Sequence, residues 1–127
     1  DNGGTEIVIT DAGMNDFIRP SLYESLHAIE RVDSAAEATL LANVVGPVCE
    51  SGDFFATDRL IPEVAPGKLL VVRTAGAYGY SMASNYNSRP RPAEVLVDGD
   101  RFALITERES DADLTRREIS APQWIED

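Results

Sequence analysis

Two apolar runs that flank a tight turn are the strongest constraint on how this sequence folds. The runs AEVLV and RFALIT are separated by Asp98-Gly99 and one further aspartate. Aspartate and glycine both tolerate positive φ angles, which the favoured short hairpin loops require. Residues 93–106 are therefore predicted to form a β-hairpin.

Most of the remaining chain shows the same pattern of short β-type runs bounded by turn residues. A short helix is predicted over residues 20–27, because a proline at its start lacks only an N–H that would be unpaired there anyway. Residues 113–119 are predicted to be either a second helix or a loose tail. Further strands are predicted over residues 5–11, 28–32, 38–45 and 68–75.

The spacing of these strands favours an all-β fold, namely a Greek-key β-barrel or β-sandwich with one or two short helices. The apolar pattern does not distinguish the barrel from the sandwich. A chain of 127 residues is long enough for one domain with a single core, and 43% hydrophobic with 26% charged residues is typical of a soluble globular protein.

Charge and apolar run length restrict the classes of partner. The net charge of −11 repels phosphate backbones and anionic lipids, so nucleic acid is not an expected partner. A membrane is not expected either, because no apolar run approaches the ~20 residues that span a bilayer.

The chain contains one cysteine, Cys49, and one histidine, His27. They allow no intrachain disulfide and are too few to build a zinc site, so no metal is expected. This cysteine usage is typical of the reducing cytoplasm, and the first residues lack the basic and apolar segments of a secretory signal. We therefore expect a cytoplasmic protein.

Four clusters of residues are candidates for chemistry. In GPVCESGD, the Cys49 thiol lies beside the Glu50 carboxylate on a rigid turn and could donate a proton. The alternative is a small buried cysteine in an ordered loop. In RPSLY, Arg19 and Tyr23 share one helical face and could hold a carboxylate together. The alternative there is a helix start with a surface arginine.

The other two clusters are rich in glycine or arginine. In TAGAYGYSM, Gly76 and Gly79 flank Tyr78, so the backbone could approach a ligand while the phenol donates to an anion. A β-bulge is the alternative interpretation. The segment Arg89-Pro90-Arg91-Pro92 could contact an anion or a partner, or could be a solvated loop.

Several long segments resemble the C-terminal half of diaminopimelate decarboxylases and follow one another in that family's order. They are DAGMNDFIRPSLYESLH, VVGPVCESGD, IPEVAPGKLLVV and TAGAYGYSMASNYNSRPRPAEVLVDG. The resemblance implies that residues 1–127 are the C-terminal β-domain of a fold-type III pyridoxal-phosphate decarboxylase. The family's N-terminal (β/α)8 barrel, which binds pyridoxal 5'-phosphate through a Schiff-base lysine, is absent from this chain.

The resemblance also implies roles for individual residues. Cys49 resembles the thiol that returns a proton to the α-carbon after CO2 leaves, and Glu50 resembles the carboxylate that meets the substrate's distal ammonium. Arg19 and Tyr23 resemble the pair that holds the distal carboxylate. Tyr78 resembles the tyrosine that contacts both cofactor and substrate. These residue types match meso-diaminopimelate, which offers one ammonium and one carboxylate at its non-reacting end.

The implied function is decarboxylation of meso-2,6-diaminopimelate to L-lysine and CO2, the last step of lysine biosynthesis by that route. The implied partners are the chain's own N-terminal barrel and a second copy in a homodimer, because Cys49 and Glu50 would reach the partner subunit's site. The chain alone is expected to be inactive, and its only lysine, Lys68, is expected to be a solvated charge.

Two alternative functions remain open at this point. One is another fold-type III decarboxylase, which would act on ornithine, arginine or a carrier-bound amino acid. The other is a free-standing β-barrel that binds a ligand or partner without catalysis. The Arg19 and Glu50 positions count against the first, and the Cys49-Glu50 pair counts against the second.

Overall fold

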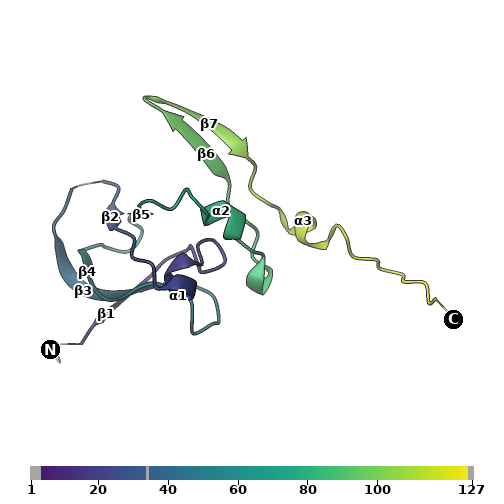
Figure 1. The fold of residues 1–127 in the computed structure, drawn as a ribbon, viewed down its shortest axis with the longest axis horizontal. Helices are drawn as coiled ribbons and strands as arrows, with labels where there is room; N and C mark the ends of the chain where they lie inside the picture. The colour runs from purple at the N-terminus through teal and green to yellow at the C-terminus, as the bar shows by residue number, and fades with distance from the viewer. Residues whose placement is uncertain (1–3, 34, 126–127) are drawn as a thin grey trace.

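The strands of this protein are short and pair into three sheets, as seen in a computed structural model that describes residues 4–33 and 35–125 (Figure 1). The first sheet contains β1 (Glu6–Ile9), β3 (Ala38–Val45) and β4 (Phe54–Pro62), in that order. Strand β1 runs parallel to β3, and β3 runs antiparallel to β4. β3 is therefore the central strand, with a neighbour on each side.

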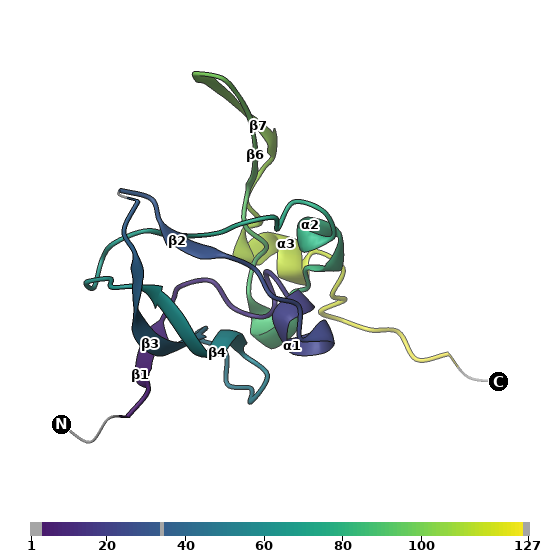
Figure 2. The same ribbon diagram turned by 60° about the vertical axis from the view of Figure 1, so that its left-hand side comes forward.

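Two further sheets have two antiparallel strands each. Strand β2 (Ile29–Arg31) pairs with β5 (Leu70–Val72), and β6 (Glu94–Asp98) pairs with β7 (Arg101–Thr106). Figure 2 shows the β6–β7 hairpin extending away from the other strands. The helices of the described residues are all short: α1 (Arg19–Tyr23), α2 (Gly79–Met82), the 3-10 helix η1 (Tyr86–Ser88) and α3 (Asp111–Thr115). None of them is long and apolar enough to cross a bilayer.

The expected mainly β fold with short helices is confirmed, but the described strands do not close into a barrel and their pairing does not establish a Greek key. The predicted hairpin is present, and the strand predicted over 38–45 has those bounds. The strands predicted over 5–11, 28–32 and 68–75 are present but shorter at both ends.

Strand β4 is not predicted by the apolar pattern, because the polar residues 57–59 interrupt it. Opposite this interruption, the β3–β4 register shifts between Ala42 and Val44. Asp58 adopts a φ of 44°, and its backbone N–H donates to the Asn43 side-chain oxygen at 2.7 Å. The irregular residues are thus satisfied by a side chain of the neighbouring strand, and the strand continues beyond them.

Helix α1 ends earlier than the predicted range 20–27. Its last turn is closed by Glu24, which has a left-handed φ of 53°. The ring of His27 packs edge-on against Phe17, with 4.7 Å between centroids, and its Nδ1 donates to the carbonyl of Arg73 at 3.0 Å. These tertiary contacts direct the chain into β2, so the helical pattern is not continued.

The later helices also differ from the sequence expectation. Of the helix or tail predicted over 113–119, residues 113–115 belong to helix α3, which starts two residues earlier because Ser110 and Asp113 form a capping box, and which ends at Thr115. Helices α2 and η1 are not predicted by any apolar pattern. Both lie in the segment that follows Tyr78, one of the candidate residues.

A single core joins the first two sheets to the loop before α1. β3 contributes its most buried residues, Ala42 and Val44, which are 0% and 1% exposed. On the opposite face, Leu41 and its partner Leu60 in β4 are 44% and 57% exposed. The β6–β7 hairpin contributes no residue to the core, whose buried members are Phe17, Ile29, Ala42, Val44, Phe55, Ala56 and Ile61.

Truncating a side chain to alanine should change the free energy of unfolding by different amounts on the two faces of β4. Ile61 is 1% exposed, so Ile61→Ala is expected to lower the free energy of unfolding by about 2–5 kcal/mol through lost burial and a residual cavity. Its neighbour Leu60 is largely exposed, and Leu60→Ala should lower it by less than about 1 kcal/mol. Urea unfolding followed by circular dichroism measures both, and equal losses would contradict this assignment of the faces.

Candidate functional site

Arg19 lies between two tyrosine rings. Its guanidinium carbon is 5.4 Å from the ring centroid of Tyr23 and 5.5 Å from that of Tyr78. Tyr23 lies one turn further along α1, and Tyr78 immediately precedes α2. Cation–π attraction to both ring faces holds the charge in place. Among the described residues no carboxylate forms an ion pair with Arg19, so its hydrogen-bonding edge is available to an anion.

The turn that carries Tyr78 has a strained backbone. Thr74 and Tyr78 have φ angles of 58° and 64°, in the left-handed region that residues other than glycine rarely adopt. The segment is a turn, and the alternative of a β-bulge does not apply. The phenol ring is 64% exposed beside Arg19. Strain of this kind persists where the surrounding structure maintains it, and it is concentrated at binding sites.

The loop between β3 and β4, which carries Cys49, is held by one buried carboxylate. Asp53 is 4% exposed, and its oxygens accept the backbone N–H of Met14 at 2.7 Å and of Val48 at 2.5 Å. A side chain on Gly46 would collide with both oxygens, so glycine leaves the room that the carboxylate occupies. Asp53 thus ties this loop to the loop that leads into α1.

Cys49 is exposed, which excludes the alternative of a buried packing cysteine. The adjacent Glu50 uses both carboxylate oxygens, because Oε1 accepts the backbone N–H of Gly52 at 3.3 Å and Oε2 accepts the hydroxyl of Tyr86 at 3.2 Å. A Cβ built on Gly52 would be 3.5 Å from Ser21 Oγ, so the loop packs against α1. The thiol and carboxylate are therefore presented on the surface of an ordered loop.

The predicted site residues form two groups. Arg19, Tyr23 and Tyr78 are brought together, and Cys49 and Glu50 are neighbours in the β3–β4 loop. Among the described residues no hydrogen bond or ion pair joins one group to the other. The two groups are connected through the backbone elements that carry them, α1 and the loop packed against it.

The arginine-rich segment is not a solvated loop but part of an internal network that sequence patterns do not indicate. Arg89 donates through Nε to Asn15 Oδ1 at 3.0 Å and through Nη2 to the carbonyl of Asp11 at 2.6 Å. Asn15 is 2% exposed, and its backbone carbonyl accepts the backbone N–H of Ser84 at 2.9 Å. The network fixes η1 against the loop before α1.

Arg91 has an internal partner as well. The carboxylate of Glu109 accepts the backbone N–H of Arg91 at 2.8 Å and the side-chain amide of Asn85 at 2.5 Å. These hydrogen bonds, first that from Arg91 and then that from Asn85, hold the pKa of Glu109 below its ordinary value. A buried amide needs hydrogen-bond partners and would indicate such structural roles. The sequence alone, however, does not show which residues are buried.

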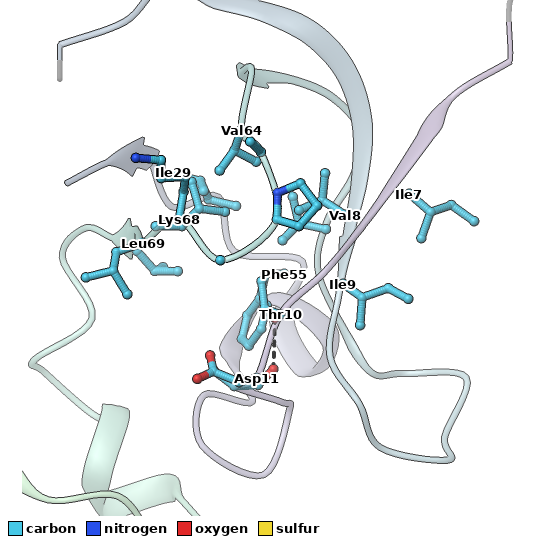
Figure 3. Close-up of a pocket in the computed structure, with 17 residues that line it drawn as sticks. Ile7, Val8, Ile9, Thr10, Asp11, Ile29, Phe55, Val64, Lys68 and Leu69 are labelled. Carbon is cyan, nitrogen blue, oxygen red and sulfur yellow. Dashed lines mark hydrogen bonds between the residues drawn. The ribbon is translucent and has the colours of Figure 1, made fainter. Parts of the chain in front are cut away.

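A separate apolar groove lies between β1 and the turn before β5 (Figure 3). It has a volume of about 630 Å³. Val8 points into it, whereas Ile7 and Ile9 point away. Lys68 is one of its lining residues and is exposed, with Nζ 3.5 Å from a carboxylate oxygen of Asp33. None of the predicted site residues lines the groove, and the described residues contain no metal-binding cluster of acidic, histidine or cysteine side chains.

Residues 1–76, more than half of the chain, match the family described as pyridoxal-dependent decarboxylase, C-terminal sheet domain. The chain belongs to this family. The matched part includes the Arg19–Tyr23 helix and the Cys49–Glu50 loop, and it ends just before Tyr78.

Individual relatives extend the similarity beyond that part. A diaminopimelate decarboxylase of Neisseria meningitidis serogroup B is 57% identical over 81% of this chain and 25% of its own length. A crystal structure of an Aquifex aeolicus protein has a TM-score of 0.87 and 46% identity, and covers 95% of this chain and 30% of that protein. The diaminopimelate decarboxylase of Helicobacter pylori complexed with L-lysine has a TM-score of 0.78 and 49% identity, over 87% of this chain and 27% of that one. The chain thus spans between a quarter and three tenths of these relatives.

The buried Asp53 should be essential for the order of the β3–β4 loop. Asp53→Asn replaces an acceptor by an amide N–H that faces backbone N–H groups, and should destabilise the protein by about 1.5–3 kcal/mol. Asp58→Asn is the matched control: Asp58 is exposed, accepts one hydroxyl at 2.8 Å, and asparagine tolerates its positive φ. Urea unfolding of both variants measures the difference. An equally small effect at both positions would show that Asp53 does not hold the loop.

Proposed function

We propose that this chain is the C-terminal domain of a diaminopimelate decarboxylase, which converts meso-2,6-diaminopimelate to L-lysine and CO2. The observation that carries the proposal is the Arg19 guanidinium, which two ring faces hold and no described carboxylate neutralises. A substrate with a carboxylate at its non-reacting end supplies the missing partner. The names of the Neisseria and Helicobacter relatives support this substrate.

The family description implies a pyridoxal cofactor, and Tyr78 fits one part of its site. The exposed phenol can donate a hydrogen bond to an anionic group such as the cofactor phosphate. Lys68, the only lysine, lies near Asp33 on the groove side, so the covalent attachment is assigned to a lysine outside this chain. When bound, pyridoxal phosphate withdraws electrons from the substrate α-carbon. This chain alone is expected to be inactive.

Cys49 is the proposed proton donor at the substrate α-carbon. A thiol carries an S–H proton that it can donate as a general acid. The thiol is exposed on an ordered loop, so it can come within reach of a group outside its own chain. Glu50, beside it, is assigned to the distal ammonium of the substrate. A thiol with this role must stay reduced, which supports a cytoplasmic location.

The separation of the two groups supports a homodimer with shared sites. Arg19, Tyr23 and Tyr78 would serve the site of their own subunit, whereas Cys49 and Glu50 would complete the site of the partner. Both groups contain exposed residues, and no hydrogen bond or ion pair joins them among the described residues. A proton donor must approach within hydrogen-bonding distance of the atom it serves, and a second copy can bring it there.

The rest of the enzyme is the proposed partner of the β6–β7 hairpin. Successive residues of a strand point to opposite faces, so consecutive apolar residues make both faces apolar. A two-stranded hairpin is marginally stable alone in water. The family's N-terminal (β/α)8 barrel domain is assigned as the structure that packs against this hairpin. In the whole enzyme, the three sheets would also close into a Greek-key barrel. The exposed apolar residues, between 52% and 79% accessible, are Val95, Leu96, Val97, Phe102, Leu104 and Ile105.

Replacing the thiol should slow the chemistry and leave binding largely intact. In the full-length enzyme, Cys49→Ala is expected to lower kcat by about 10²–10⁴-fold, the usual contribution of a general acid, with little change in KM. The exposed neighbour Ser51 provides a control, because Ser51→Ala should keep the wild-type kcat. Steady-state CO2 release measures both. A near-normal kcat for Cys49→Ala would reduce the cysteine to a loop residue.

Arg19 should be needed for the distal carboxylate. Arg19→Lys should impair the full-length enzyme nearly as much as Arg19→Ala, because lysine lacks the planar fork that meets two carboxylate oxygens. The loss corresponds to about 1.5–3 kcal/mol, or roughly one to two decades in kcat/KM for diaminopimelate.

L-Lysine is the control substrate for Arg19, since it lacks the distal carboxylate. Any turnover of L-lysine should change little in either variant. If both substrates lose activity equally, Arg19 supports the helix and does not bind substrate. Faster turnover of ornithine or arginine than of diaminopimelate by the wild-type enzyme would favour the alternative decarboxylase.

A further inference from the structure

The Glu50 carboxylate is held from outside its own loop by Tyr86. The Tyr86 hydroxyl donates to Glu50 Oε2 at 3.2 Å, while Oε1 accepts the backbone N–H of Gly52 at 3.3 Å. A carboxylate has about four acceptor positions on its two oxygens. The two hydrogen bonds therefore restrict the rotation of the side chain and leave acceptor positions for a cationic ligand.

Tyr86 is itself placed by the network around Asn15. It is the first residue of η1, in which Asn87 and Ser88 have left-handed φ angles of 60° and 56°. The segment on either side is fixed to Asn15 by the backbone N–H of Ser84 and by the side chain of Arg89. The phenol thus reaches Glu50 from a rigid turn.

The charge of Glu50 also acts on the phenol. The hydrogen bond to Glu50, followed by the charge of Glu50, desolvation and the charge of Cys49, raises the pKa of Tyr86 above its ordinary 10.0. The phenol therefore remains a donor at physiological pH. Since Glu50 accepts this bond as a carboxylate, the pair presents a negative charge in a defined orientation beside the Cys49 thiol.

We propose that Tyr86 is a positioning residue that orients the Glu50 carboxylate toward the distal ammonium of the substrate. The inference rests on the proposed function, which assigns that ammonium to Glu50. A preorganised carboxylate loses less side-chain entropy when it binds, so the contribution of Tyr86 should appear in substrate binding and not in proton donation. Tyr86 acts through Glu50, so its effect should exist only while the Glu50 carboxylate is present.

The first experiment removes the hydroxyl alone in the full-length enzyme. Tyr86→Phe is expected to lower kcat/KM for meso-diaminopimelate about tenfold, mainly through a higher KM with kcat retained. Tyr80→Phe is the matched control, because no hydrogen bond of the Tyr80 hydroxyl is present among the described residues, and it should stay within about twofold of wild type. A Tyr86→Phe variant that loses kcat at unchanged KM would overturn the inference.

The second experiment tests whether Tyr86 acts through Glu50. In a Glu50→Gln background, Tyr86→Phe should cause no further loss in kcat/KM, and independent losses that multiply would overturn the inference. Spectrophotometric titration of the enzyme without added cofactor, against Tyr86→Phe as the blank, should show a lower Tyr86 pKa in Glu50→Gln. An unchanged Tyr86 pKa would overturn this inference but would leave the proposed function standing. A wild-type KM for Glu50→Gln would instead overturn the role of Glu50 in the proposed function, and this inference with it.

Discussion

The buried Asp53 carboxylate is the interaction on which the geometry of the candidate site depends. It accepts backbone N–H groups of two loops, from Met14 before α1 and from Val48 between β3 and β4. One loop leads to Arg19 and the other carries Cys49. A buried charge is tolerated only when it is hydrogen-bonded, so the carboxylate is satisfied only if both loops are in place. The helix that carries Arg19 and the loop that carries Cys49 are thus positioned by one group.

A second buried polar residue, Asn15, extends this arrangement to the third segment of the site. Its side-chain oxygen accepts a hydrogen bond from Arg89, and its backbone carbonyl accepts one from the N–H of Ser84. These two bonds fix η1 and with it Tyr86. The chemistry-bearing side chains therefore lie on short loops and helices, and the β1-β3-β4 sheet provides the rigid base. This division between scaffold and loops is common in binding sites, because loop side chains can be varied without disturbing the core.

The surface of the domain argues against a free-standing binding module. Such a module has no need for an arginine held by two aromatic rings without a carboxylate, or for an exposed thiol beside a carboxylate. Nor would it gain from a hairpin that is apolar on both faces. Exposed apolar surface of this kind is typical of a protein that packs against further structure.

The sequence by itself determined the β6–β7 hairpin, the bounds of β3 and the local pairs Arg19–Tyr23 and Cys49–Glu50, because turn chemistry, strand alternation and motifs act over a few neighbouring residues. Only the tertiary structure decided that β4 continues through its polar interruption, that α1 ends at Glu24, and that Tyr86 meets Glu50. These features depend on contacts between segments far apart in the chain. The hydrogen-bond partners of a buried carboxylate or amide come from the segments that the fold places beside it. The local sequence pattern therefore does not identify those partners.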